Sequence, residues 1–443
     1  MIIIKKYTLL TFAFCIISLG VMAQATINSP YSKFGVGNLT GSYLPQNKGF
    51  GNLAYGISNY GGYQNINISN PASYSKIRLT TFDVGARSTV QSLSRNNNTE
   101  NSFNGSLNHL IIAVPVTKTS ALSFGILPYS NLGYQFNNAA SIDTINFNHT
   151  YTGEGGLTKA YLGYGLGIGK NFNVGVNMSY IFGSLKETRG ADFSTSNSTA
   201  NFLNTKTEDN NAVGGLYFDL GAQYVGYFDK DKKVTLGYTG GANTQLNTKL
   251  SQLVTRFYLN NGAEIRTDTI AVRGEVAGKL IIPTNHNFGF SIEKLNKWLI
   301  GADVRFANWS DFRNNGVNQN LNNTFGFSVG TQITPNVNAV TQYFKLMDYR
   351  FGFNYENGSA WTAVTKVMAQ SRMQLAGLHC HIGTYMLSSQ AYAVAALLAG
   401  AADMDAHALQ APHRVVEVLA HAPDLAVEPL RQHDAEGVAT HLR

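Results

Sequence analysis

The sequence contains few charged residues and few cysteines for its length. Asp, Glu, Lys and Arg make up only 13% of its 443 residues, whereas about 25% is usual in soluble domains. The two cysteines, Cys15 and Cys380, lie far apart, and Cys15 falls within an N-terminal segment that we expect to be removed. The single remaining cysteine excludes an intramolecular disulfide framework.

The sequence lacks the features that nucleic-acid binding, metal binding and catalysis require. The net charge of +7 is spread along the chain without a block of Lys and Arg, so nucleic acid is not an expected partner. His109, His149 and His286 are too scattered to suggest a metal site. Because the residues before about 358 contain no catalytic constellation, we expect a protein that is not an enzyme and needs no cofactor.

Glycine (44), tyrosine (23) and phenylalanine (25) are abundant, and residues 281–312 show how they are used. Phe288, Phe290 and Ile292 alternate with small or polar residues, and the same alternation resumes after a polar turn. Such a pattern predicts two neighbouring β-strands, each with one apolar and one polar face. The apolar face would pack on a second sheet in a soluble sandwich, or contact lipid in an outer-membrane barrel.

The N-terminus has the features of a cleavable secretory signal, assigned to residues 1–23. Lys5 and Lys6 precede an apolar run over residues 7–21, and we expect cleavage before Gln24. The run is too short to span a membrane comfortably. The signal therefore predicts export from the cytoplasm.

Alternating segments recur from residue 77 onward, separated by polar breaks. Aromatic residues near their ends would suit interfacial girdles, namely Tyr161, Phe182, Tyr227, Phe228 and Trp309. We expect the longer polar spacers, near residues 96–101, 194–211 and 314–323, to be extracellular loops. About eleven strands are expected, at residues 77–93, 102–117, 119–137, 149–169, 171–190, 211–229, 232–250, 270–292, 297–312, 324–334 and 341–357.

The segment 281–312 resembles a hairpin of the FadL-like outer-membrane transporters of long-chain fatty acids and hydrocarbons. The matching residues are Pro283, Gly289, Asp303, Trp309, Ser310 and Phe312. The resemblance covers residues 25 to about 358, and the SPYSKFG opening is similar to that of Bacteroidetes-type members. It implies an all-β antiparallel transmembrane barrel of about fourteen strands, of which about eleven are present here at residues 77–358. It also implies the bacterial outer membrane as location, with outer-membrane lipid, hydrophobic small molecules and the barrel-assembly machinery as partners.

The family's function is passive uptake of hydrophobic compounds, with exit through the side of the barrel. The same family also contains barrels that are accessories for secretion or surface attachment, which is the alternative function here. The family has an N-terminal hatch with an Asn-Pro-Ala motif, which Asn70, Pro71 and Ala72 match within residues 24–76. An ordinary Asn-Pro turn would explain the same residues.

Pro128 interrupts an otherwise strong strand, LSFGILPYSNLGYQF. Proline cannot donate to a sheet ladder, so it predicts a bulge, a kink or an edge. The FadL-like family has a kink in this strand that opens a lateral gap. The resemblance therefore assigns Pro128, Asn131 and Gly133 to a substrate path. Alternatively, the strand ends at Pro128. Asp303 and Arg305 share an inner face and are further candidates for the path, although lumenal charges also pair simply to stay hydrated.

Residues 359–443 differ in composition from the rest of the chain, being rich in alanine and histidine. His379, His381 and Gly383 match part of a motif of PLP-dependent decarboxylases of the diaminopimelate and ornithine type. The Schiff-base lysine of that family has no counterpart, so these residues alone cannot perform its chemistry. A metal site at residues 379–381 is a second hypothesis. A third is a non-functional chimera, in which a barrel is joined near residues 358–370 to a decarboxylase fragment.

Overall fold

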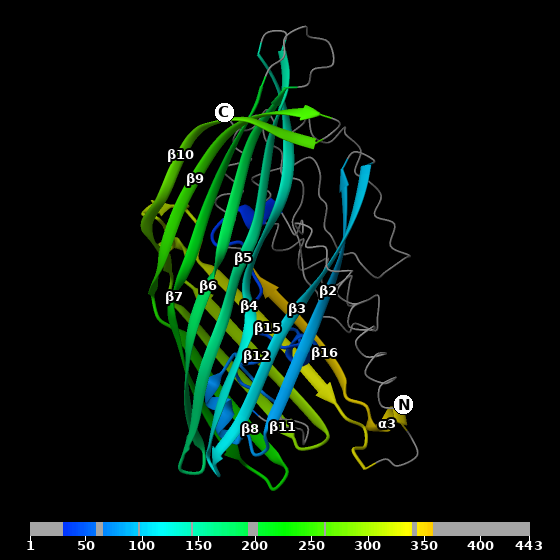
Figure 1. The fold of residues 1–443 in the computed structure, drawn as a ribbon. Helices are drawn as coiled ribbons and strands as arrows, with labels where there is room; N and C mark the ends of the chain where they lie inside the picture. The colour runs from blue at the N-terminus through cyan, green and yellow to red at the C-terminus, as the bar shows by residue number, and fades with distance from the viewer. Residues whose placement is uncertain are drawn as a thin grey trace, which may run out of the picture.

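The computed structural model describes residues 30–58, 65–95, 98–142, 145–193, 203–260, 263–338 and 343–357. The predicted signal peptide (1–23) and tail (359–443), including His379, His381 and Gly383, lie outside these residues. The described chain is almost entirely antiparallel β-sheet, as the alternation predicts (Figure 1). No described helix is long and apolar enough to cross a membrane.

The strands vary from 2 to 24 residues. They are β1 (Asn38–Leu39), β2 (Thr81–Arg95), β3 (Asn98–Thr117), β4 (Ser120–Ile142), β5 (Ile145–Ile168), β6 (Phe172–Phe193), β7 (Asn204–Tyr227), β8 (Lys232–Gly241), β9 (Thr244–Asn260), β10 (Ala263–Ile282), β11 (Asn285–Lys294), β12 (Trp298–Ala307), β13 (Arg313–Asn314), β14 (Val317–Asn318), β15 (Thr324–Ile333) and β16 (Tyr349–Glu356). The short helices are η1 (Pro30–Lys33), α2 (Pro45–Lys48), η2 (Pro71–Lys76), η3 (Trp309–Asp311) and α3 (Tyr343–Leu346).

The main path of the sheet runs β16-β15-β12-β11-β8-β7-β6-β5-β4-β3-β2, which is eleven strands. Strands β8 and β9 both pair with β7, β8 along residues 219–227 and β9 along residues 204–214. Strand β10 pairs with β9. Every step along the path is antiparallel, so β2 and β16 run in the same direction. These two strands do not pair with each other within the described residues. An antiparallel ring would therefore need an odd number of further strands, and three, the difference between eleven and the expected fourteen, is odd.

The two faces of the sheet differ as an outer-membrane barrel requires. On β6, Phe172, Met178 and Tyr180 point outward and are exposed, whereas Asn173 and Asn177 point inward and are buried. Other strands repeat this inversion, with large apolar side chains outside and small or polar ones inside. An apolar outer surface is stable only against lipid.

The central strands are longer than the membrane requires. Strands β4, β5, β6 and β7 have 22 to 24 residues, whereas about 9–11 tilted residues span the hydrocarbon core. All three expected loops are strand in part, because residues 98–101 belong to β3, residues 204–211 to β7, and residues 314 and 317–318 to β13 and β14.

The aromatic girdle prediction requires side chains on the outer surface, which excludes two of the five residues and leaves the prediction untested for the other three. Phe182, Tyr227 and Phe228 are exposed on the outer surface. Tyr161 is instead 5% exposed and bonds Ser123 on the inner side, and Trp309 is buried in an interior cluster because the chain turns inward at η3. Position near a strand end does not reveal which face a residue occupies.

The segment before β2 lies against the inner face of the sheet, and we use the name hatch for its described residues, 30–58 and 65–76. Its residues Leu44, Ile66 and Tyr74 pack in one buried cluster with inner residues of β3, β4 and β5. Inner-face glycines allow its backbone to approach closely: a Cβ at Gly237 would lie 1.9 Å from the carbonyl oxygen of Tyr55. The abundance of glycine on the inner face is thereby explained.

Candidate functional site

Strands β3 and β4 separate part of the way along their length. Between their described residues, pairing runs from Thr117 and Ser120 as far as Leu110 and Ile126. Beyond this point β3 stays paired with β2, and β4 stays paired with β5. The upper parts of β2 and β3 diverge from β4 in Figure 1. We call residues 127–142 of β4 the separated segment.

Pro128 lies at the start of the separated segment. The register between β4 and β5 shifts between Pro128 and Ser130, which marks a bulge. The strand does not end at Pro128 but continues to Ile142, so the alternative of a terminating strand is wrong. A missing N–H group at the point of separation fits the loss of the β3 ladder.

Hatch strand β1 pairs with the separated segment in place of β3. Asn38 and Leu39 pair with Asn131 and Ser130. Close approach requires Gly37, whose φ is +92° and whose Cβ would lie 2.5 Å from the Asn131 carbonyl oxygen. The predicted path residue Asn131 is therefore covered by the hatch.

Side-chain hydrogen bonds extend this contact in both directions. The Thr40 hydroxyl donates to the Pro128 carbonyl at 2.6 Å. At the other end, the Gly133 N–H donates to the Ser32 hydroxyl at 3.1 Å. Pro128, Asn131 and Gly133 thus all lie on the separated segment and all contact residues 32–40.

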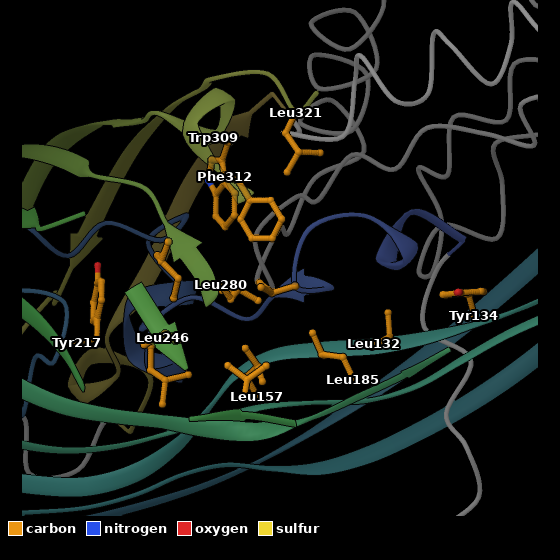
Figure 2. Packing of buried hydrophobic residues seen from close by; sticks show 14 residues of the cluster. Leu132, Tyr134, Leu157, Leu185, Tyr217, Leu246, Leu280, Trp309, Phe312 and Leu321 are labelled. Atoms are coloured by element: carbon orange, nitrogen blue, oxygen red, sulfur yellow. The ribbon is translucent and has the colours of Figure 1, made fainter. Parts of the chain in front are cut away.

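A large apolar cluster occupies the interior beside the separated segment (Figure 2). Its side chains come from the inner faces of β4, β5, β6, β7, β9 and β10, from the loop around η3 and from the hatch. They are Val36, Leu132, Tyr134, Leu157, Ile181, Leu185, Val213, Tyr217, Leu246, Leu280, Ile282, Trp309, Phe312 and Leu321. We call this set the interior apolar cluster. The lumen of an aqueous porin is polar, so this part of the barrel has a different character.

A partly buried ion pair borders the interior apolar cluster. The Lys159 ammonium on β5 lies 2.7 Å from the Asp219 carboxylate on β7, and its side chain is 4% exposed. Two positions along β5, Leu157 belongs to the cluster. Lys159 also lies over the ring of Tyr217, 5.4 Å from its centroid.

Asp303, on strand β12, binds the hatch through its carboxylate. Its carboxylate accepts the backbone N–H groups of Ala54, Tyr55 and Gly56 at 2.6, 3.0 and 3.4 Å. The side chain is buried, and the carboxylate is satisfied by these donors. Asp303 therefore lies at the contact between hatch and wall.

Arg305 shares the inner face with Asp303, as the alternation predicts, but it contacts neighbouring strands. It donates to the Ser328 hydroxyl at 2.7 Å and to the Asn354 side chain, and it lies 3.5 Å from the Glu356 carboxylate. These contacts connect β12 to β15 and β16. Asp303 and Arg305 thus lie away from the separated segment in sequence and in sheet order.

The Asn-Pro-Ala motif begins η2, and its asparagine has two functions. The Asn70 side-chain oxygen Oδ1 accepts the Ala72 N–H at 3.1 Å and so caps the helix. Its amide group donates to the Tyr55 carbonyl at 2.9 Å. Pro71 packs against Gly175, where a Cβ would lie 2.3 Å from the Pro71 carbonyl carbon. The motif is thus an Asn-capped turn buried at the hatch–wall contact.

The interior apolar cluster was not identified from the sequence. Its signal is a loss of the apolar–polar alternation: on β6, even-numbered residues face outward, yet the inward-facing Ile181 and Leu185 are also apolar. Among the described residues, no group of three His, Cys, Asp or Glu side chains could hold a metal ion.

Comparisons with solved structures give distant similarities. A Pseudomonas aeruginosa FadL homologue is 12% identical, with a TM-score of 0.44 over 73% of this chain and 81% of that one. The Pseudomonas putida toluene transporter TodX is 14% identical, with a TM-score of 0.47 over 73% and 85%.

Two diaminopimelate decarboxylases match a short stretch. The Bacillus subtilis enzyme is 35% identical over 68 residues, which is 15% of this chain and 16% of that protein. The Corynebacterium efficiens enzyme is 31% identical over 68 residues. The chain spans about one sixth of the length of these curated relatives.

One family model covers most of the chain. The BamG model matches residues 3–368, which includes all of the described residues. Together with the apolar outer surface of the sheet, this match identifies a β-barrel protein of the bacterial outer membrane. The chain belongs to the BamG family.

Proposed function

We propose that the chain is an outer-membrane channel for passive uptake of hydrophobic compounds, either long-chain fatty acids or hydrocarbons. The observation that carries the proposal is the interior apolar cluster, which includes Leu132 and Tyr134 of the separated segment. A hydrophobic molecule held there would be surrounded by apolar side chains and would lie beside a strand edge that β3 has left.

Exit would then be sideways, between β3 and β4, into the lipid. Residues 32–40 of the hatch cover the separated segment, so they must move before a molecule can leave. Because Pro128 has no backbone N–H group, β4 cannot form a complete hydrogen-bond ladder with β3 here. The edge of β4 therefore stays available when the hatch moves away. We propose that Pro128, Asn131 and Gly133 line this exit, and that Asp303 and Arg305 hold the hatch and the neighbouring wall in position.

Uptake by cells tests the proposal directly. Cells whose lipopolysaccharide-containing outer membrane lacks other uptake channels would express the full chain and receive a radiolabelled fatty acid or hydrocarbon. We expect faster uptake than in cells without the chain, and slower uptake by Leu157→Gln, which places a polar amide in the interior apolar cluster. Equal uptake with and without surface-expressed chain would refute the proposal.

The second candidate is an accessory role in secretion, surface attachment or barrel assembly. Membership in the BamG family favours it, because the name of the family is associated with barrel assembly. Stable co-purification of the full chain with the barrel-assembly machinery, together with unchanged hydrophobic uptake after deletion, would favour this role over the channel.

A further inference from the structure

The residues beside the interior apolar cluster limit the charge that a passing molecule can carry, provided that the proposed channel function holds. Lys159 lies on the inner face of β5, between Leu157 of the interior apolar cluster and Tyr161 of the cluster around the hatch. Its partner across the β4–β5 ladder is Leu127, the residue before Pro128. A molecule in the interior apolar cluster would therefore have one end next to Lys159 and close to the proposed exit.

The positive charge of Lys159 is already neutralised. Asp219 lies 2.7 Å from its ammonium group, and the lysine side chain is 4% exposed while that of Asp219 is 21% exposed. Asp219 lies two positions along β7 from Tyr217 of the cluster, so a carboxylate arriving from the cluster would come close to its negative charge. Like charges brought together away from water repel strongly, and an anion buried without a partner is costly.

Charges at the other end of the cluster are also balanced. Lys33 lies over the rings of Phe136 and Tyr151, which pack against the cluster. Glu187 and Arg189 act electrostatically on Lys33, and Arg189 forms an ion pair with Asp209. Among these four described residues, two cations balance two carboxylates, so the group carries no net positive charge to attract an anion.

We propose that the Lys159–Asp219 pair makes the channel selective for uncharged hydrophobic molecules, and that Asp219 is the residue that rejects carboxylates. The preferred class is then the neutral hydrocarbon or alcohol rather than the ionised fatty acid. Asp219 determines specificity by neutralising Lys159, which borders the cluster beside the exit.

Trp309 provides a spectroscopic signal, because it is part of the interior apolar cluster. The full chain in nanodiscs would be titrated with bromoundecanol and with bromoundecanoate, whose terminal bromine quenches tryptophan fluorescence. The pH would be about 9, where the carboxylate is ionised. Quenching that disappears in Trp309→Phe reports binding in the cluster rather than partition into the lipid.

We expect the wild-type chain to bind the alcohol at least roughly tenfold more tightly than the carboxylate. Asp219→Asn leaves Lys159 unmasked and should shift the carboxylate-to-alcohol affinity ratio by roughly tenfold towards the carboxylate. The double variant Lys159→Met with Asp219→Asn should lose this gain. Glu275→Gln is the matched control, since Glu275 pairs with Lys249 where both side chains are more than 60% exposed.

Equal wild-type affinities, or a ratio that Asp219→Asn does not change, would overturn the selectivity proposal while leaving the channel intact. If neither ligand quenched Trp309, the channel proposal itself would fail, and the selectivity proposal with it. Should Asp219→Asn not fold by circular dichroism, the wild-type ratio and the double variant still test the proposal.

Discussion

Replacement of Asp303 by alanine should release the hatch from the barrel wall. The carboxylate accepts three backbone N–H groups, two of them at 2.6 and 3.0 Å and the third at a weaker 3.4 Å. A hydrogen bond to a charged group contributes about 1.5–3 kcal/mol, and a buried donor left without a partner costs about 1–3 kcal/mol. Counting only the two short bonds, we expect the docking free energy of the hatch turn to fall by about 3 kcal/mol.

Hydrogen–deuterium exchange measures this loss at the affected amides. If Ala54, Tyr55 and Gly56 exchange through local opening, a loss of about 3 kcal/mol accelerates their exchange by roughly 150-fold. Glu275→Gln is the control, because its ion pair with Lys249 is exposed and does not involve the hatch. Unchanged protection of the three amides in folded Asp303→Ala would refute the assignment of Asp303 as the hatch anchor.

Three further predictions concern the strand edge and the hatch. Pro128→Ala restores an N–H group at the point where β3 leaves β4, so we expect slower hydrophobic uptake with an unchanged circular dichroism spectrum; unchanged uptake would count against the proposed exit. Gly237→Ala places a Cβ 1.9 Å from the Tyr55 carbonyl oxygen, so we expect faster exchange of the hatch amides, and full protection would contradict the close packing. Burial, with a smaller contribution from Arg87, lowers the pKa of Lys48 to about 8 from its ordinary 10.5. Below about pH 8 the lysine is charged in both states, and burying that charge weakens docking of the hatch. Protection of the hatch amides should therefore increase as the pH rises from about 8 to about 10.5, where the docked lysine is neutral. Lys48→Met should remove this pH dependence.

The outer face of the barrel could be predicted from the sequence, because lipid imposes one simple rule on it. Every second residue of a strand such as β6 must be apolar, so Phe172, Met178 and Tyr180 show the period directly. The same rule gave eleven segments that contain the eleven strands of the main path, but two of them are wrong in extent: residues 232–250 combine β8 with β9, and residues 270–292 combine β10 with β11. The rule says nothing about where neighbouring strands separate.

The interior was harder to predict, because its contacts join residues far apart in the sequence. Asp303 bonds Ala54 across 249 positions, and no local pattern identifies an acceptor of that kind. Inner apolar residues such as Ile181 and Leu185 interrupt the alternation without indicating which other strands they face. The Asn-Pro-Ala motif was placed by resemblance, but the carbonyl group that Asn70 binds follows only from the fold.

A reversible cross-link between β1 and β4 tests the central claim most directly. Asn38 and Asn131 are paired residues of these strands, so cysteines at both positions can form a disulfide that fixes the hatch over the proposed exit. Asn137 and Thr150, paired between β4 and β5, provide the control cross-link, which leaves the hatch free. We predict that oxidation of the first pair stops hydrophobic uptake, that reductant restores it, and that the control pair has no effect. Undiminished uptake with the hatch fully cross-linked to β4 would contradict the account.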